Sequence, residues 1–264
     1  MRTVLEFASA KAAGRKISMV TCYDASLARA LEASAVDCLL VGDSVAMVVH
    51  GHPDTLSATV ELMALHTAAV RRGAPTRFLV GDLPFLSFRR GVPAALDAVA
   101  ALMRAGAQAV KLEGVLGHED VITAIVGSGI PVMGHLGLTP QSVHGLGGFR
   151  VQGKSDADAA RLVDQARQLE QLGCFALVLE CVPARLATRI TAELRIPTIG
   201  IGAGAACDGQ VLVLQDLLGL FGGIRPKFVR TYCNGFDQVR DAVDRFDRDV
   251  KHETFPGPEE CYEA

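Results

Sequence analysis

Two apolar runs in this sequence end with the same Gly-Asp pair. The run 38–41 leads into Gly42-Asp43-Ser44, and the run 78–80 leads into Gly81-Asp82. Each run is typical of a buried parallel strand, and a carboxylate at its end costs free energy unless a cation neutralises it. Two strands that deliver an aspartate to one rim favour a hard divalent cation between them. The alternative is that each aspartate caps the helix after its strand.

Four more polar residues stand in or at the ends of apolar runs. Lys111 and Glu113 are two residues apart, so on a strand their side chains point the same way, either into a site or as a simple ion pair. His135 follows the run 131–134 and, taken alone, could be a core histidine bonded to a backbone carbonyl. Glu180 ends a run with no cation beside it in the sequence, which favours a role in proton transfer.

The order of elements predicts an α/β fold. Expected strands are 17–21, 38–44, 77–82, 109–114, 131–135, 175–180, 197–202 and 210–213. Expected helices are 3–13, 24–32 with Asp24 as its cap, one that ends at about Arg72, 93–104, 118–127 and 156–172.

Eight strands alternating with helices favour a closed (β/α)₈ barrel, which typically takes about 250 residues. The chain has 264 residues and no GxGxxG motif after the first strand, which counts against a dinucleotide-binding fold. We expect one barrel domain over 1–264, with an N-terminal capping helix, a C-terminal helical extension and a peripheral tail at 253–264. In such a barrel the strand ends share one rim, where active sites lie.

Composition excludes several classes of protein. The formal net charge is −3 without basic clusters, so neither nucleic acid nor an anionic membrane is an expected partner. No apolar segment reaches the roughly 18 residues that span a bilayer, and no signal-peptide core is seen at the N-terminus. The seven cysteines are scattered without a CxxC pair, which indicates reduced thiols. We expect a soluble, cytoplasmic protein.

Two further motifs have ordinary structural explanations. The glycines of 200–204 could hold a phosphate, but a tight turn after a strand explains them equally well. His50 and His52 lie in a polar loop, where exposure to solvent is the simpler interpretation than metal ligation.

Seven stretches of the sequence closely resemble the ketopantoate hydroxymethyltransferase family. They are 41–44, 66–74, 82–85, 110–114, 134–142, 179–183 and 199–204. The resemblance implies a phosphoenolpyruvate/pyruvate-type (β/α)₈ barrel that assembles as a homodecamer. It also implies transfer of a hydroxymethyl group from 5,10-methylenetetrahydrofolate to 3-methyl-2-oxobutanoate, giving 2-dehydropantoate in pantothenate synthesis.

The resemblance also assigns roles to the strand-end residues. Asp43 and Asp82 match the family's Mg²⁺ ligands, with Glu113 in the coordination sphere. Glu180 matches the general base.

The same resemblance implies the set that binds the oxo acid. It consists of Ser44, Asp82 and Lys111, and we expect Asp43 and His135 to bind the oxo acid as well.

The strand-end residues together could form an enolate from a 2-oxo acid. A 2-oxo acid can chelate Mg²⁺, which stabilises the enolate formed when the neighbouring C–H is lost. Lys111 adds positive charge at the same oxygens, and Glu180 takes the proton. Two alternatives stay open: Lys111 could form a Schiff base in a metal-free aldolase with Glu113 or Glu180 as base, or the barrel could be a non-catalytic scaffold or ligand-binding subunit.

Overall fold

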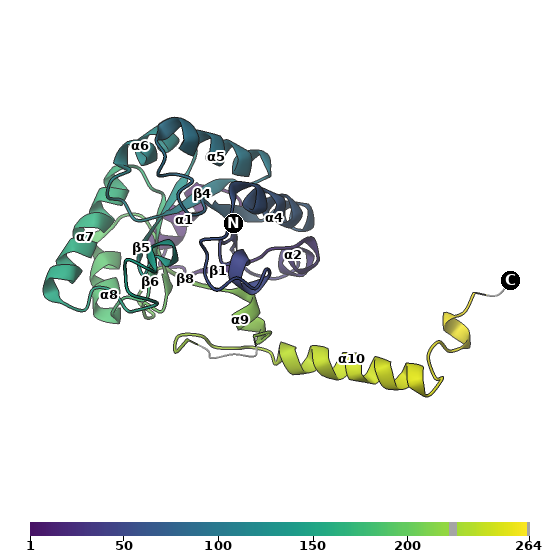
Figure 1. The fold of residues 1–264 in the computed structure, drawn as a ribbon. Helices are drawn as coiled ribbons and strands as arrows, with labels where there is room; N and C mark the ends of the chain where they lie inside the picture. The colour runs from purple at the N-terminus through teal and green to yellow at the C-terminus, as the bar shows by residue number, and fades with distance from the viewer. Residues whose placement is uncertain (222–225, 263–264) are drawn as a thin grey trace. The chain divides into compact units, whose positions relative to one another are not determined.

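The computed structural model describes residues 1–221 and 226–262 (Figure 1). The chain divides into two compact units, Met1–Val213 and Leu214–Ala264, and each is described by itself.

The first unit is a closed barrel of eight parallel strands in sequence order, β1-β2-β3-β4-β5-β6-β7-β8. The strands are β1 Ile17–Thr21, β2 Cys38–Val41, β3 Phe78–Asp82, β4 Ala109–Glu113, β5 Val132–Gly137, β6 Ala176–Glu180, β7 Thr198–Ile201 and β8 Gly209–Leu212. The expected (β/α)₈ barrel is therefore confirmed. Each strand begins and ends within two residues of its expected range, except that β2 ends at Val41, three residues before the expected Ser44.

Helices surround the outside of this barrel (Figure 1). The helices of the first unit are α1 Val4–Ala12, α2 Ala25–Glu32, α3 Val45–Val48, α4 Val60–Gly73, α5 Val92–Arg104, α6 Glu119–Gly127, α7 Asp156–Gln171 and α8 Ala184–Glu193, with a 3₁₀ turn at Pro140–Ser142. Sequence patterns did not predict α3 or α8. The cap at Asp24 is confirmed, because its side chain accepts the backbone N–H groups of Ser26 and Leu27 at 2.7 and 2.9 Å.

Helix α1 closes the N-terminal end of the barrel. Its buried Phe7 makes edge-to-face contacts with Phe78, the first residue of β3, and with Phe175 beside β6, both at 5.2 Å between ring centroids. The barrel interior above these rings is filled by aliphatic residues such as Met19, Val80 and Met133. Because this end is packed with apolar groups, polar side chains at the other end of the strands define the functional rim.

The second unit contains α9 Leu214–Leu218, α10 Gly235–Lys251 and a 3₁₀ turn at Pro258–Glu260. These helices confirm the expected C-terminal extension. One stripe of α10 is apolar and exposed within this unit, formed by Phe236, Val239, Val243, Phe246 and Val250. A single domain over 1–264 with a peripheral tail at 253–264 stays a prediction.

The structure also bears on membrane-spanning helices and on the state of the cysteines. Over the part that the structure describes, no helix combines the length and apolar character that crossing a bilayer requires. All seven cysteines are free thiols.

Candidate active site

The strand register brings the polar residues of the rim together. Across β3 and β4, Asp82 stands opposite Lys111, and across β4 and β5, Glu113 stands opposite His135. The next pair, between β5 and β6, places Glu180 opposite Gly137. Four neighbouring strands therefore deliver four charged residues and a histidine to one rim.

Asp43 and Asp82 lie side by side at this rim. The backbone N–H of Asp43 donates to Oδ2 of Asp82 at 3.1 Å, although the residues are 39 positions apart. Both side chains are buried, with 4 and 2% of their residue surface exposed. Oδ2 of Asp43 accepts from Nε2 of Gln141 at 2.8 Å, and Oδ1 of Asp82 is 2.8 Å from Nζ of Lys111. These long-range contacts, and not helix capping, explain both aspartates.

The two glycines that precede these aspartates lack a side chain for different structural reasons. A Cβ on Gly42 would lie 2.8 Å from Oγ of Ser44 and 3.5 Å from Oδ2 of Asp82, so Gly42 permits the close approach of the site residues. A Cβ on Gly81 would instead meet Leu102 and Ala107 at 3.5 Å, on the helix side of the strand. In the repeated Gly-Asp pair, Gly42 is thus needed for the geometry of the site, and Gly81 for packing between strand and helix.

Lys111 is the lysine of this buried cluster. Its Nζ pairs with Asp82 across the β3–β4 register and lies 3.4 Å from Nδ1 of His135. Burial opposes the charged form, but the carboxylates of Asp82, Glu113 and Asp43 outweigh it and raise the pKa of Lys111 above its ordinary range. These contacts therefore favour the positively charged form of the side chain.

His135 lies between two carboxylates. Its Nδ1 is 3.6 Å from Oε1 of Glu113, and its Nε2 is 3.3 Å from Oε2 of Glu180. Burial and Lys111 lower the pKa of His135, but Glu113 and Glu180 outweigh them and raise it to about 9. His135 is thus a bridge within the site, and the interpretation as a core histidine bonded to a backbone carbonyl is wrong.

The rim holds more negative charge than its cations balance. Burial is the largest cause that raises the pKa of Asp43, to about 8, and the neighbouring Asp82 and Glu113 add to it. Burial likewise raises the pKa of Asp82, against the opposing effect of Lys111. A buried pair of carboxylates that resists ionisation is the electrostatic setting in which a divalent cation binds.

The donor set fits Mg²⁺ through two carboxylates. Among the residues described, no three His, Cys, Asp or Glu side chains gather into a set that would hold a metal by themselves. Glu113 has other partners, since Oε2 accepts the Gln141 backbone N–H at 2.9 Å and Oε1 faces His135. Mg²⁺ commonly binds through one or two carboxylates, with substrate and water completing its shell. The oxygens of Asp43 and Asp82 suit that requirement, and ligation of a metal by Asp43, Asp82 and Glu113 stays a prediction.

Sequence reasoning missed two residues of the site. Gln141, in the 3₁₀ turn after β5, joins Asp43, Glu113 and the carbonyl of Leu83 through its backbone N–H and side-chain amide. Tyr23 is buried after β1, and its hydroxyl lies 2.8 Å from Oγ of Ser44. Gln141 stands within a stretch that resembles the family, but its contacts span up to 98 positions, which a sequence pattern does not show.

The chain turns sharply directly after Glu180. Cys181 has φ +47°, a left-handed conformation that is uncommon outside glycine. Its backbone is held on both sides, because its N–H donates to Ile201 and its carbonyl accepts from Gln152, both at 2.9 Å. Backbone strain of this kind at a rim residue is typical of functional sites.

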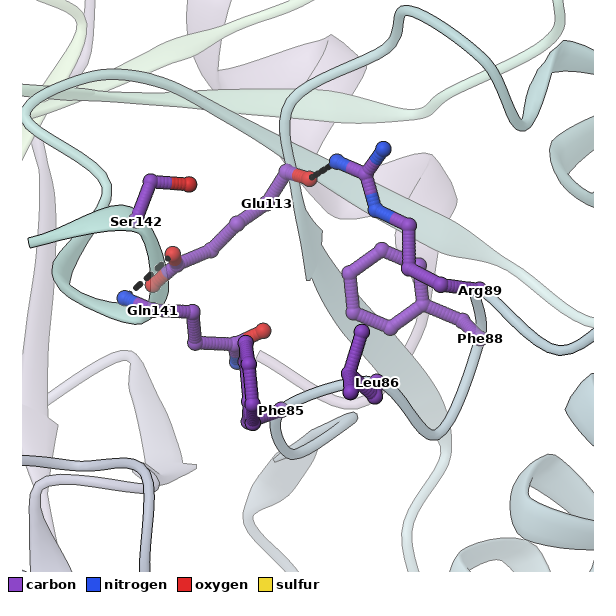
Figure 2. A pocket seen from close by; sticks show the side chains of 7 residues that line it. All are labelled: Phe85, Leu86, Phe88, Arg89, Glu113, Gln141 and Ser142. Atoms are coloured by element: carbon purple, nitrogen blue, oxygen red, sulfur yellow. Dashed lines mark hydrogen bonds between the residues drawn. The ribbon is translucent and has the colours of Figure 1, made fainter. Parts of the chain in front are cut away.

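A pocket with a cavity volume of about 300 Å³ adjoins the cluster (Figure 2). Its lining residues are Phe85, Leu86, Phe88, Arg89, Glu113, Gln141 and Ser142. Glu113 and Gln141 belong to both the cluster and the pocket wall, so the two share a boundary.

The remaining motifs lie outside the cluster or serve as turns. His50 and His52 are exposed as expected, and Nε2 of His50 contacts Nε2 of His66 at 3.0 Å. Gly202 and Gly204 have φ +64° and +85°, which explains the glycines after β7 as a tight turn.

Fold and site together define a (β/α)₈ barrel enzyme with an acidic, buried site at the carboxyl ends of its strands. Among solved structures, similar folds include a phosphonopyruvate hydrolase in complex with oxalate and Mg²⁺, with TM-score 0.62, 11% identity and coverage of 98% of this chain and 93% of that one. A 2,3-dimethylmalate lyase, a PEP mutase/isocitrate lyase superfamily member, has TM-score 0.60, 16% identity and coverage of 95% and 89%. These likenesses show the fold alone.

Sequence comparison is more specific. The family model for ketopantoate hydroxymethyltransferase matches residues 1–258. Proteins named 3-methyl-2-oxobutanoate hydroxymethyltransferase include one from Bdellovibrio bacteriovorus, 53% identical over 99% of this chain and 100% of its own length. Another, from Francisella tularensis, is 49% identical over 100% and 99%. The chain belongs to the ketopantoate hydroxymethyltransferase family, and it is an enzyme.

Proposed function

We propose that this enzyme transfers a hydroxymethyl group from 5,10-methylenetetrahydrofolate to 3-methyl-2-oxobutanoate, with Mg²⁺ at Asp43 and Asp82 and Glu180 as the base. The main observation in support of this proposal is the arrangement of charged side chains at the rim. Two adjoining buried carboxylates and Lys111 lie on one side of His135, and the Glu180 carboxylate lies on the other. Family membership and the relatives' names support the choice of reaction.

The first requirement is to bind the oxo acid with its reactive C–H acidified. Mg²⁺, when bound, polarises the ketone and stabilises the enolate. Asp43 and Asp82 would hold the ion, and the protonated Lys111 adds a fixed positive charge beside Asp82. Ser44 offers a hydroxyl to the substrate, oriented by its 2.8 Å contact with Tyr23.

The second requirement is a base aimed at the C3 hydrogen. Glu180 is only partly exposed, with 17% of its side chain accessible, and His135 lies beside its Oε2. The carboxylate takes the C3 proton, and the resulting enolate carbon forms the new C–C bond to the methylene carbon of the co-substrate. Both bonds from that carbon to the folate nitrogens are broken, and oxygen from water takes the place of nitrogen on it. Overall, one water supplies the hydroxyl oxygen, and tetrahydrofolate and 2-dehydropantoate are released.

The electrostatics count against the Schiff-base alternative. A nucleophilic lysine must lose its proton, yet the carboxylates around Lys111 raise its pKa. A silent scaffold is also disfavoured, because a barrel that only supports structure does not need a buried excess of carboxylates, which costs free energy.

Hydrogen exchange at C3 of the oxo acid tests the proposal. We expect wild type to exchange this hydrogen with D₂O in a Mg²⁺-dependent manner, measured by NMR, and EDTA to stop the exchange. Glu180→Gln should abolish exchange while Mg²⁺-dependent oxo-acid binding persists. The matched control is Glu61→Gln, at an exposed glutamate of α4. Exchange in Glu180→Gln at the wild-type rate would remove Glu180 from the role of base.

Assembly and location complete the proposal. The homodecamer implied by family resemblance stays a prediction, which sedimentation equilibrium tests by the mass of the assembly. Cytoplasmic location likewise stays a prediction.

A further inference from the structure

The pocket beside the rim is built by the loop between β3 and α5. Phe85, Leu86, Phe88 and Arg89 of this loop line it, together with the last residue of β4 and two residues that follow β5 (Figure 2). About 300 Å³ is at the lower end of the range for ligand pockets. The space therefore suits one ring system and not a whole large cofactor.

The loop holds apolar side chains at the surface. Phe85 and Leu86 keep 39 and 48% of their surface exposed, next to a rim that is otherwise acidic. Leu86 has φ +59°, in the left-handed region that leucine rarely adopts, and the N–H of Ser87 donates to the carbonyl of Pro84 at 3.0 Å. Exposed apolar residues on a strained backbone are a feature of ligand-binding loops.

Arg89 is held at the pocket wall by backbone carbonyls, and within the described part of the chain no carboxylate lies at ion-pair distance from it, although Glu113 and Glu119 act on its charge from further away. Its guanidinium donates to the backbone carbonyls of Leu116 at 2.9 Å and Glu113 at 3.3 Å. The group also lies over the ring of Phe88, at 5.4 Å from the centroid. The planar cation is therefore immobilised, and carbonyl oxygens do not cancel its charge.

We propose that this pocket binds the pterin ring of the co-substrate, with Phe85 and Leu86 against the ring face and Arg89 and Ser142 at its polar edge. The inference rests on the proposed function. A pterin is a flat bicyclic ring with an amide and amino edge, which matches an apolar wall faced by a fixed guanidinium and an exposed hydroxyl.

Position also favours this occupant. Glu113 and Gln141 form part of the pocket wall and also bond within the rim cluster. A ring held here stands next to the proposed oxo-acid site, and the one-carbon unit it carries has a short path to the enolate carbon. The acidic rim repels anions unless a metal is bound, so we place only the metal-chelating oxo acid there.

The test separates ring binding from chemistry at the rim. Phe85→Ala removes the aromatic wall, and Phe85→Tyr keeps it. Leu5→Ala, at an exposed leucine of α1 at the other end of the barrel, is the control. Each variant is measured for tetrahydrofolate binding by calorimetry, for the KM of methylenetetrahydrofolate, and for Mg²⁺-dependent exchange at C3 of the oxo acid without co-substrate.

We expect Phe85→Ala to weaken tetrahydrofolate binding and raise that KM roughly tenfold, with exchange at C3 unchanged, and Phe85→Tyr to restore both. Unchanged tetrahydrofolate binding in Phe85→Ala would overturn the inference. So would an equal loss of exchange, since the loop would then act through the rim. If wild type binds tetrahydrofolate through Phe85 but catalyses neither exchange nor transfer, the pocket assignment stands and the proposed function fails.

Discussion

Nε2 of His135 lies 3.3 Å from Oε2 of Glu180, and both side chains point into the rim from neighbouring strands. The contact is at ion-pair distance but lacks the alignment of a good hydrogen bond. With Lys111 at 3.4 Å from Nδ1, a neutral imidazole carries its proton on Nε2, and a protonated one carries a proton there as well. In either state His135 presents an N–H to the proposed base.

Replacing His135 with glutamine should slow proton exchange at C3 of the oxo acid by about 10- to 100-fold. The reason is that glutamine removes the imidazole N–H that faces Oε2 of Glu180 and helps to hold that carboxylate in place. A well-aligned donor to a charged group contributes about 1.5–3 kcal/mol, which sets the upper end of the effect. NMR exchange rates in D₂O measure the effect, and Mg²⁺-dependent binding of the oxo acid by calorimetry serves as the control. A variant that exchanges as fast as wild type would show that Glu180 needs no such partner.

The left-handed turn at Cys181 predicts opposite results from two substitutions. Cys181→Gly should keep or increase the free energy of unfolding and preserve exchange, because glycine adopts φ +47° without strain. Cys181→Val should lower the free energy of unfolding by about 1–2 kcal/mol, because a β-branched residue is strongly disfavoured there. Urea unfolding of both proteins measures the difference. Equal stabilities would mean that this turn is not under strain.

Asp37 provides a pH-dependent contribution to stability away from the rim. Burial raises its pKa, but hydrogen bonds from Ser18 and the Arg15 ion pair outweigh that and lower it below the ordinary 3.8. A lowered folded-state pKa gives stability that is present above about pH 3.8 and is lost as pH falls through the folded value.

Asp37→Asn should therefore be less stable than wild type at pH 7, by no more than about 1 kcal/mol because solvent screens this partly exposed group. The difference should shrink toward pH 3. Urea titrations at both pH values measure it, with Asp97→Asn, at an exposed aspartate of α5, as the control. If the stability difference stayed constant with pH, the lower stability of Asp37→Asn would come from packing and not from the lost charge.

The sequence predicted the barrel well because its signals are local. Apolar runs such as 38–41 mark strands, and turn residues between them mark the βα units. Helix α8 was missed, since its buried residues Leu186, Ala187 and Ile190 are interrupted by arginine and threonine. Parallel pairing then follows from the alternation of strands and helices.

The site was only partly predictable, because its contacts are not local. The rim residues are recognisable by type at strand ends, but their partners depend on register. Lys111 pairs with Asp82 on the neighbouring strand, whereas the sequence left open whether Lys111 pairs with Glu113, two residues away, or points with it into a site. Gln141 contacts Asp43 across 98 positions, and no spacing rule predicts that.

The most direct test of this account is the location of the metal, because the proposed enolate chemistry depends on a cation between Asp43 and Asp82. Crystals grown with Mn²⁺ in place of Mg²⁺ and with 3-methyl-2-oxobutanoate give an anomalous signal from the ion alone. The account predicts a peak within about 2.0–2.6 Å of carboxylate oxygens of both Asp43 and Asp82, with the oxo acid in the same coordination shell. Bound oxo acid with no anomalous peak between these two side chains would contradict it.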